Sequence, residues 1–252
     1  MMQDLRSRAD SCGVDYLGVV RAEDYDAQAP AGHRLGDWLP TAKTAVVIGI
    51  RLLDAVLEDL PRQRKEYTAL FHTVNYRLND ALLQLGKFLQ ARGHLAFPIM
   101  YKEVSGWNLE RRSALTLKLA KPFVALPALK RVVDPSLWGE VSYKHLAAAA
   151  GLGELGVSDL VLAPGAGARA RWAVLLTDAE IPSTGPARSL NLCRPDECAY
   201  ACVRACPVGA IPERKGGIHK ARCLQYYLEL GIPSLDGLRC GLCVAHCPAW
   251  KW

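Results

Sequence analysis

Cys240-Gly-Leu-Cys-Val-Ala-His-Cys-Pro248 lies near the end of this chain of 252 residues. A similar run precedes it, in which cysteines are separated by four, three and three residues and the last is followed by proline: Cys193, Cys198, Cys202 and Cys206-Pro207. With Cys223 between the runs, this segment holds eight of the nine cysteines. The repeated pattern predicts two sites of four thiolates each.

Such runs are typical of the ligands of [4Fe–4S] clusters in bacterial ferredoxins, where the cysteine before proline binds the other cluster of the pair. This rule divides the eight cysteines into two sets. The first cluster is predicted to bind Cys193, Cys198, Cys202 and Cys247, and the second Cys206, Cys223, Cys240 and Cys243. Because the two halves exchange a ligand, we expect the clusters to lie side by side.

Two features depart from the ferredoxin pattern. The first run is wider than C-x2-C-x2-C, and sixteen residues separate Cys223 from Cys240. A three-cysteine cluster without Cys193 is therefore an alternative. Zinc also binds four thiolates, but usually through paired C-x2-C knuckles, of which the chain has one, so the pattern favours iron–sulfur. Cys12 lies far from the others and is predicted to be a buried, small apolar residue.

Composition indicates an ordinary globular protein, with 50% hydrophobic and 22% charged residues. No apolar run approaches the roughly 20 residues that span a bilayer. The polar start, Met1-Met2-Gln3-Asp4, resembles neither a signal peptide nor a twin-arginine leader. Thiolates at cluster spacing favour a reducing compartment. We therefore expect a cytoplasmic protein that does not bind membranes.

The formal net charge of +6 allows two interpretations. It can be a solvated basic surface, or it can dock an acidic electron donor such as reduced ferredoxin or flavodoxin, since complementary charge speeds encounter. The Lys and Arg residues do not form a stripe with interleaved aromatics. Nucleic-acid binding is therefore not expected.

Strand and helix patterns alternate up to about residue 180. Helices are predicted at 66–92 and 140–150, and strands at 13–21, 45–51, 95–99, 159–163 and 171–177. This order predicts an α/β or α+β layer structure around a central sheet. The segment 181–186 is predicted to be a linker. Beyond it Cys, Pro and Gly dominate the composition, so we expect domains at 1–182 and 183–252.

Gly151-Leu-Gly-Glu-Leu-Gly156 matches the G-x-G-x-x-G pattern of dinucleotide-binding proteins. That pattern must follow a strand and open a helix, whereas here it follows an alanine-rich helix. The glycines are instead predicted to end the helix. They would also let backbone approach a large, flat ligand closely.

The stretch from Ser142 to Gly156, Ser-Tyr-Lys-His-Leu-Ala-Ala-Ala-Ala-Gly-Leu-Gly-Glu-Leu-Gly, resembles the helix-and-glycine signature of epoxyqueuosine reductases and reductive dehalogenases. Residues 169–178 and the cysteine runs resemble the same family, in the same order. The resemblance covers roughly residues 40–250. It implies an α+β fold, with a nitroreductase-like, cobalamin-binding domain followed by a ferredoxin-like domain with two [4Fe–4S] clusters. Electrons would pass through the clusters to the corrinoid cobalt.

The resemblance also implies a reaction and a site. The reaction is reductive removal of a leaving group or an oxygen from a small organic substrate. Tyr143 would act as the acid beside Lys144, and the corrinoid pocket would include His145, Gly151, Leu152, Gly153 and Gly156. Alternatively, Tyr143 packs on the helix, Lys144 is solvated and His145 is structural. Asp134, Tyr101 and Glu103 are further candidate acids, and Trp250 and Trp252 either shield a cluster or pack at a domain interface.

Two departures from the family bear on the substrate. Epoxyqueuosine reductases carry an acidic residue at the position of Leu137, and their tRNA-contacting repeats have no counterpart here. We therefore do not expect queuosine maturation. Two alternative functions are an activator that reduces the corrinoid of a partner protein, and a flavin-dependent reductase on the same scaffold.

Overall fold

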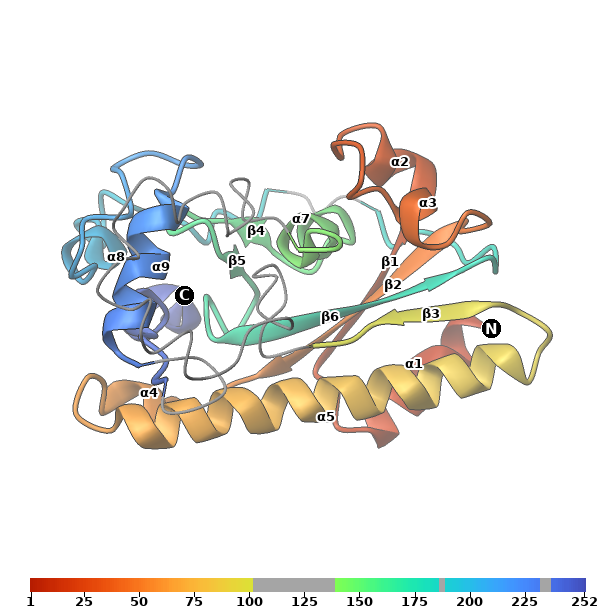
Figure 1. The fold of residues 1–252 in the computed structure, drawn as a ribbon, viewed down its shortest axis with the longest axis horizontal. Coiled ribbons are helices and arrows are strands. Elements are labelled where there is room, and N and C mark those ends of the chain that lie inside the picture. The colour runs from red at the N-terminus through yellow and green to blue at the C-terminus, as the bar shows by residue number, and fades with distance from the viewer. Residues whose placement is uncertain (102–138, 186–188, 232–236) are drawn as a thin grey trace, which may run out of the picture.

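The computed structural model describes residues 1–101, 139–185, 189–231 and 237–252 (Figure 1). The helices and strands up to β3 are α1 (Met2–Ser11), β1 (Tyr16–Arg21), α2 (Ala22–Asp26), α3 (Leu35–Trp38), β2 (Thr44–Arg51), α4 (Asp54–Glu58), α5 (Arg64–Gln90) and β3 (Ala96–Ile99). Those that follow are α7 (Tyr143–Ala149), β4 (Glu154–Leu155), β5 (Val161–Leu162), β6 (Ala170–Thr177), α8 (Ala201–Arg204), α9 (Lys220–Glu229), α10 (Leu242–Ala245) and the 3-10 helix η4 (Pro248–Lys251).

A four-stranded antiparallel sheet in the order β1-β2-β6-β3 forms the centre of the fold. In the two middle strands Val46 is paired with Leu175, and Val46 is also paired with Val19 of β1. Both middle strands are buried along most of their length, as expected for β-branched and aliphatic runs covered on both faces. The short strands β4 and β5 form a separate hairpin.

Helices cover both faces of the sheet, α5 on one side and α7 on the other (Figure 1). On α5 the buried residues recur at helical spacing and face the sheet and α1: Phe71, Val74, Leu78, Leu82, Leu85 and Leu89. On the opposite face Leu146 and Ala147 of α7 pack against Trp172 and Val174 of β6. Across the described residues, no helix is both long enough and apolar enough to cross a bilayer.

The mixed α+β class predicted from the sequence is confirmed. The predicted strands are found at β1, β2, β3 and β6, while the strand expected at 159–163 is limited to Val161–Leu162. The predicted helix at 66–92 is α5, and the one at 140–150 is the shorter α7. Helix α1 was not predicted, since its mostly polar sequence buries only Leu5 and Ala9. The division into two domains remains a prediction.

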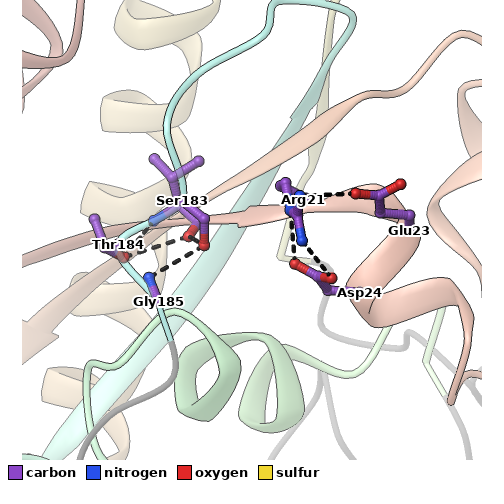
Figure 2. Close-up of polar contacts among 7 residues, drawn as sticks. Arg21, Glu23, Asp24, Ser183, Thr184 and Gly185 are labelled. Atoms are coloured by element: carbon purple, nitrogen blue, oxygen red, sulfur yellow. Dashed lines mark hydrogen bonds and ion pairs between the residues drawn. The ribbon is translucent and has the colours of Figure 1, made fainter.

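The predicted linker is held against the edge strand β1 (Figure 2). Thr184 N donates to the carbonyl of Val19 at 3.0 Å, and Val19 N donates to Thr184 Oγ1 at 3.0 Å. The same hydroxyl donates to the carbonyl of Ala150 at 2.5 Å, just beyond α7. Figure 2 also shows Arg21 paired with Asp24 and Glu23 where β1 leads into α2. The linker is therefore hydrogen-bonded both to β1 and to the residue that follows α7.

Candidate functional site

The turn after α7 closes the helix in the way that its glycines predict. Gly151 adopts a left-handed conformation with φ 76°, its N–H donates to Ala148 O, and Leu152 N donates to Ala147 O, both at 3.0 Å. This pair of hydrogen bonds is a Schellman motif, which satisfies the last carbonyls of the helix. The interpretation of the glycine pattern as a helix stop is confirmed.

The other two glycines of the pattern allow close contact between segments of the protein. A Cβ atom on Gly153 would lie 2.3 Å from the carbonyl oxygen of Leu162. On Gly156 it would lie 3.0 Å from Leu162 Cδ1 and 3.5 Å from Cys193 Sγ. The missing side chains thus let β4 fold onto β5 and bring the turn against the cysteine-rich segment. Their predicted contact with a flat ligand remains a prediction.

Four cysteines line one cavity behind this turn. They are the set that the sequence assigns to the first cluster: Cys193, Cys198, Cys202 and Cys247. Gly156 and Trp252 line the same cavity, and Val157 N donates to Cys193 Sγ at 3.3 Å. Cys193, whose role the wide spacing left open, is therefore placed with the other three.

The remaining four cysteines form a second group. Burial raises the pKa of the Cys223 thiol to about 11, with further contributions from Cys240 and Cys206. Burial also raises the pKa of Cys243, which is influenced by Cys223, Cys240, Cys202 and Cys206. Because Cys202 belongs to the first set, the two groups lie next to each other.

Burial and, to a smaller extent, the neighbouring Cys247, Cys198 and Cys193 together raise the pKa of the Cys202 thiol to about 11. Four thiols this close cannot all ionise at neutral pH unless a positive charge lies between them, which the iron of a cluster supplies. Within the described ranges, no three His, Cys, Asp or Glu side chains are grouped closely enough to hold a single ion. Ligands of a cubane surround a larger core, so they stand further apart than ligands of one ion.

The C-terminal tryptophans occupy different places. Trp252 lines the cavity of the first cysteine set, and the Arg194 guanidinium lies 5.0 Å from its ring centroid. Trp250 instead packs against the turn before β6, where a Cβ on Gly167 would lie 2.6 Å from Trp250 N. Of the two predicted roles, shielding fits Trp252 and packing at the contact between segments fits Trp250.

Two cavities lie along α7, and His145 lines both. One has a volume of about 770 Å³ and includes Tyr25 and Ser183. The other has a volume of about 410 Å³ and includes Tyr143, Lys144 and Arg171. Gly151, Leu152 and Gly153 line neither cavity. The structure therefore places the predicted site residues in separate surroundings, with Tyr143, Lys144 and His145 together and Gly156 beside the cysteines.

Tyr143 holds its proton firmly. Its hydroxyl donates to the carbonyl of Ile99 at 2.9 Å. Burial raises the pKa of Tyr143 and Glu140 raises it further, while Arg171 acts in the opposite direction. The phenol is therefore protonated at neutral pH, which is the state that a general acid requires.

The neighbours of Tyr143 are also engaged. Lys144 Nζ forms an ion pair with Asp159, a left-handed residue with φ 60°, so Lys144 is not simply solvated. His145 Nδ1 lies 2.6 Å from Ser142 Oγ. Burial and then Lys144 lower the pKa of His145, so its imidazole is neutral at pH 7. Of the further candidate acids, Tyr101 lines the smaller cavity, whereas Asp134 and Glu103, like Leu137, lie outside the described residues.

The sequence did not predict Arg171 or Asp159 as site residues. Arg171 follows Ala170 at the start of β6, within an otherwise apolar strand. The charge inside this strand could have identified Arg171 as a candidate site residue, because a charge withdrawn from water without a partner is costly. Asp159 carried no comparable signal, since an acidic residue in a turn is common.

No protein-family model and no curated protein sequence matches this chain. Several solved structures are similar to it. The epoxyqueuosine reductase from Streptococcus thermophilus matches 100% of this chain and 66% of its own, with 16% identity and a TM-score of 0.63. An epoxyqueuosine reductase bound to a tRNA stem loop matches 99% of this chain and 65% of its own, with 19% identity and a TM-score of 0.61.

A reductive dehalogenase described in connection with B12-dependent dehalogenation matches 98% of this chain and 31% of its own, with 18% identity and a TM-score of 0.62. The chain thus spans less than two thirds of the length of these reductases. One neighbour binds tRNA, which is at odds with the expectation that nucleic acid is not a ligand here. The resemblance found in the sequence is confirmed at the level of the fold, and this chain has the fold that epoxyqueuosine reductases and reductive dehalogenases share.

Proposed function

We propose that this protein is an oxidoreductase that passes electrons through two [4Fe–4S] clusters to a cobalamin, which reduces a small organic substrate. The reaction would remove a leaving group or an oxygen. The observation that carries the proposal is the cavity lined by Cys193, Cys198, Cys202 and Cys247, which also includes Gly156 of the β4–β5 hairpin. It supports the proposal because the four predicted ligands of one cluster line a single cavity, beside the hairpin that follows α7.

The cysteines present fit two clusters. Each set has four members, as a cubane requires, and the cysteine before each proline belongs to the opposite set, as in two-cluster ferredoxins. Peptide N–H groups that point at sulfur, such as Val157 N toward Cys193, stabilise the negative charge of a reduced cluster. We propose that residues 183–252 form a ferredoxin-like domain and residues 1–182 a nitroreductase-like one.

The surroundings of α7 fit a corrinoid in part. Cavities of about 770 and 410 Å³ are both lined by His145, and the larger one is also lined by Ala148 and Ala149 toward the end of α7. Bound there, a cobalamin would supply a cobalt centre that accepts single electrons from a cluster. His145, neutral at pH 7, is suited to hydrogen bonding with an amide of such a ligand.

The chain itself would hold and deliver a proton. Tyr143 keeps its proton at Oη against the carbonyl of Ile99, and it lines the smaller cavity. Lys144, which is ion-paired with Asp159, lines the same cavity, and Arg171 is the cation that acts on the pKa of Tyr143. We propose Tyr143 as the proton donor and Lys144 as the group that stabilises negative charge on the substrate.

The electron donor is proposed to be acidic, such as reduced ferredoxin or flavodoxin. The net charge of +6 supports this, because opposite charge speeds encounter between redox partners. A cytoplasmic location is proposed on the same grounds as the clusters, since thiolate ligands persist in a reducing compartment.

Anaerobic purification followed by reconstitution with iron, sulfide and cobalamin tests the proposal. We expect about eight iron atoms per chain, about one cobalamin retained through gel filtration, and bleaching of the cluster absorbance by a chemical reductant. Candidate substrates are then screened with the reduced protein. An epoxyqueuosine stem loop belongs in the screen, because one structural neighbour binds a tRNA stem loop.

Other cofactor contents would replace the proposal with a different one. Bound flavin without cobalamin would identify a flavin-dependent reductase. Clusters without either cofactor, together with reduction of a corrinoid partner protein, would identify an electron-transfer activator. Zinc in place of iron would contradict all of these functions.

A further inference from the structure

Arg171 is a half-buried cation that lines the smaller cavity. It lies near the start of β6, and its side chain points to the α5 side of the sheet, where its guanidinium lies 4.2 Å from the ring centroid of Phe71. Strand β3 ends opposite Val174, so it does not cover the part of β6 that carries Arg171. The cavity of about 410 Å³ opens at this place.

The guanidinium has little to balance its charge. Its single hydrogen bond joins Nε to Asn75 Oδ1 at 3.4 Å, and no carboxylate pairs with it in the part of the chain that the structure describes. Its neighbours are the rings of Phe71 and of the tyrosines Tyr67, Tyr101 and Tyr227. Burial lowers the pKa of Arg171, but an arginine remains charged at neutral pH. A charge that is largely withdrawn from water and has no carboxylate partner among the described residues is costly, so its retention requires a reason.

The unused hydrogen-bonding groups of Arg171 face the cavity. Neither Nη atom of Arg171 has a hydrogen-bond partner among the described residues. Neither of them is fully buried. Because Arg171 lines the cavity, its two Nη groups are accessible from it. Two parallel N–H groups of this kind match the two oxygens of a carboxylate.

The other charges of the cavity add to this preference. Lys220 and Lys144 line it together with Arg171, whereas Glu140 is the one acidic residue among the described residues that line it. Lys144 also pairs with Asp159, which balances part of its charge. The volume of about 410 Å³ is within the range for small organic ligands.

We propose that Arg171 binds a carboxylate on the molecule that occupies this cavity, so that the substrate is an organic acid. This deepens the proposed function, because the occupant is taken to be the substrate of the reductase. Arg171 would act as a specificity-determining residue, and Tyr143 would lie on another wall of the same cavity.

Benzoate and benzamide are suitable probes, since they have nearly the same shape and differ in charge. Binding is measured by equilibrium dialysis with the full-length, reconstituted protein under anaerobic conditions. We expect benzoate to bind at least about tenfold more tightly than benzamide, and Arg171→Gln to remove that difference. Arg171→Lys should keep part of the preference for benzoate, because the ammonium group keeps the positive charge but lacks the two parallel N–H groups of the guanidinium.

Two controls separate recognition from general attraction. Arg62→Gln removes an exposed arginine that is paired with Asp59, and it should leave benzoate binding unchanged. Lys220→Gln removes a charge from the same cavity and should weaken benzoate less than Arg171→Gln does. Equal losses from Lys220→Gln and Arg171→Gln would overturn the proposal, as would equal binding of benzoate and benzamide to the wild type. If Arg171→Gln fails to fold, Arg171→Lys and the wild-type ratio of the two probes decide.

The outcome is independent of the cofactor test. The protein could bind no cobalamin and still prefer benzoate in a way that depends on Arg171. That result would support the acid site and contradict the proposed function. Full cobalamin and cluster content without selectivity for benzoate would leave the proposed function standing and overturn the acid site.

Discussion

The guanidinium of Arg169 lies 4.2 Å from the ring centroid of Trp250, and this contact joins the turn before β6 to the last helical turn of the chain. Arg169 is 2% exposed. Its Nη1 pairs with Asp54 Oδ1 at 2.7 Å, and its Nη2 donates to Ala245 O at 3.2 Å, at the end of α10. One buried side chain therefore connects α4, α10 and the C-terminal tryptophan.

Replacing Arg169 should loosen the cysteine-rich segment. We expect Arg169→Leu to lower the free energy of unfolding by about 3 kcal/mol, because it removes a buried, charge-assisted contact. Arg51→Gln is a matched control, since Arg51 pairs with the same Asp54 carboxylate but is 37% exposed. It should cost less than about 1 kcal/mol. Urea denaturation of the reconstituted proteins measures both, and equal costs would contradict the assigned role.

The crossed ligand sets predict which cysteine variants behave alike. Cys202→Ala and Cys247→Ala should each lose the first cluster, so that iron falls from about eight to about four atoms per chain. Cys243→Ala should lose the second cluster instead. Cys12→Ala is the control, because Cys12 packs against the core of α1 and α5 and should leave the iron unchanged. Electron paramagnetic resonance of the reduced variants should show one signal for Cys202→Ala and Cys247→Ala and a different one for Cys243→Ala.

The close contact at Gly153 predicts a strong steric effect. Gly153→Ala would push a methyl group to 2.3 Å from a backbone oxygen, so the β4–β5 hairpin must open. We expect a loss of about 2 kcal/mol in the free energy of unfolding. Gly86→Ala on α5 should do the opposite, because its nearest neighbour would be 3.7 Å away and alanine favours a helix by about 1 kcal/mol. Thermal unfolding followed by circular dichroism compares the two.

Tyr143→Phe tests the proposed proton donor. The variant should keep both clusters and cobalamin but lose about 100-fold or more in turnover, which is the usual contribution of a general acid. Tyr16→Phe serves as the control, because the Tyr16 hydroxyl also donates to a backbone carbonyl, that of Pro164 at 2.8 Å, but it lines neither of the two cavities. Unchanged turnover in Tyr143→Phe would assign Tyr143 a structural role through its bond to Ile99.

His145 should make the fold sensitive to acid. Its pKa is lowered in the folded protein by burial and by Lys144, while Asp159 opposes and Lys220 adds to this effect. The unfolded chain therefore binds the proton more readily, so stability is lost as the pH falls below about 6.5, the ordinary pKa of histidine. The difference in unfolding free energy between pH 7.5 and pH 6 should be smaller in His145→Gln than in the wild type. An identical difference in both proteins would contradict the assignment.

Local patterns in the sequence were sufficient for much of this structure. Apolar residues at a spacing of three and four predicted α5, and β-branched runs predicted β2 and β6, because these periods follow from the geometry of a single helix or strand. The cysteine spacing predicted the set of four thiols that the first cavity brings together, including Cys193. The glycine pattern predicted the end of α7, since a left-handed residue there strongly favours glycine.

Contacts between distant residues were decided by the tertiary structure. Arg169 meets Asp54 across 115 positions of the chain, and Tyr143 meets Ile99 across 44. No period or spacing encodes such a pair, because it depends on how the sheet, the helices and the cysteine-rich segment pack. The same packing separates Gly153 from the cavities and presents Arg171 to one of them. The sequence by itself determined the thiol sets and the main secondary structure, whereas the charges and proton donors around the cavity were set by tertiary packing, which alone determines burial and proximity.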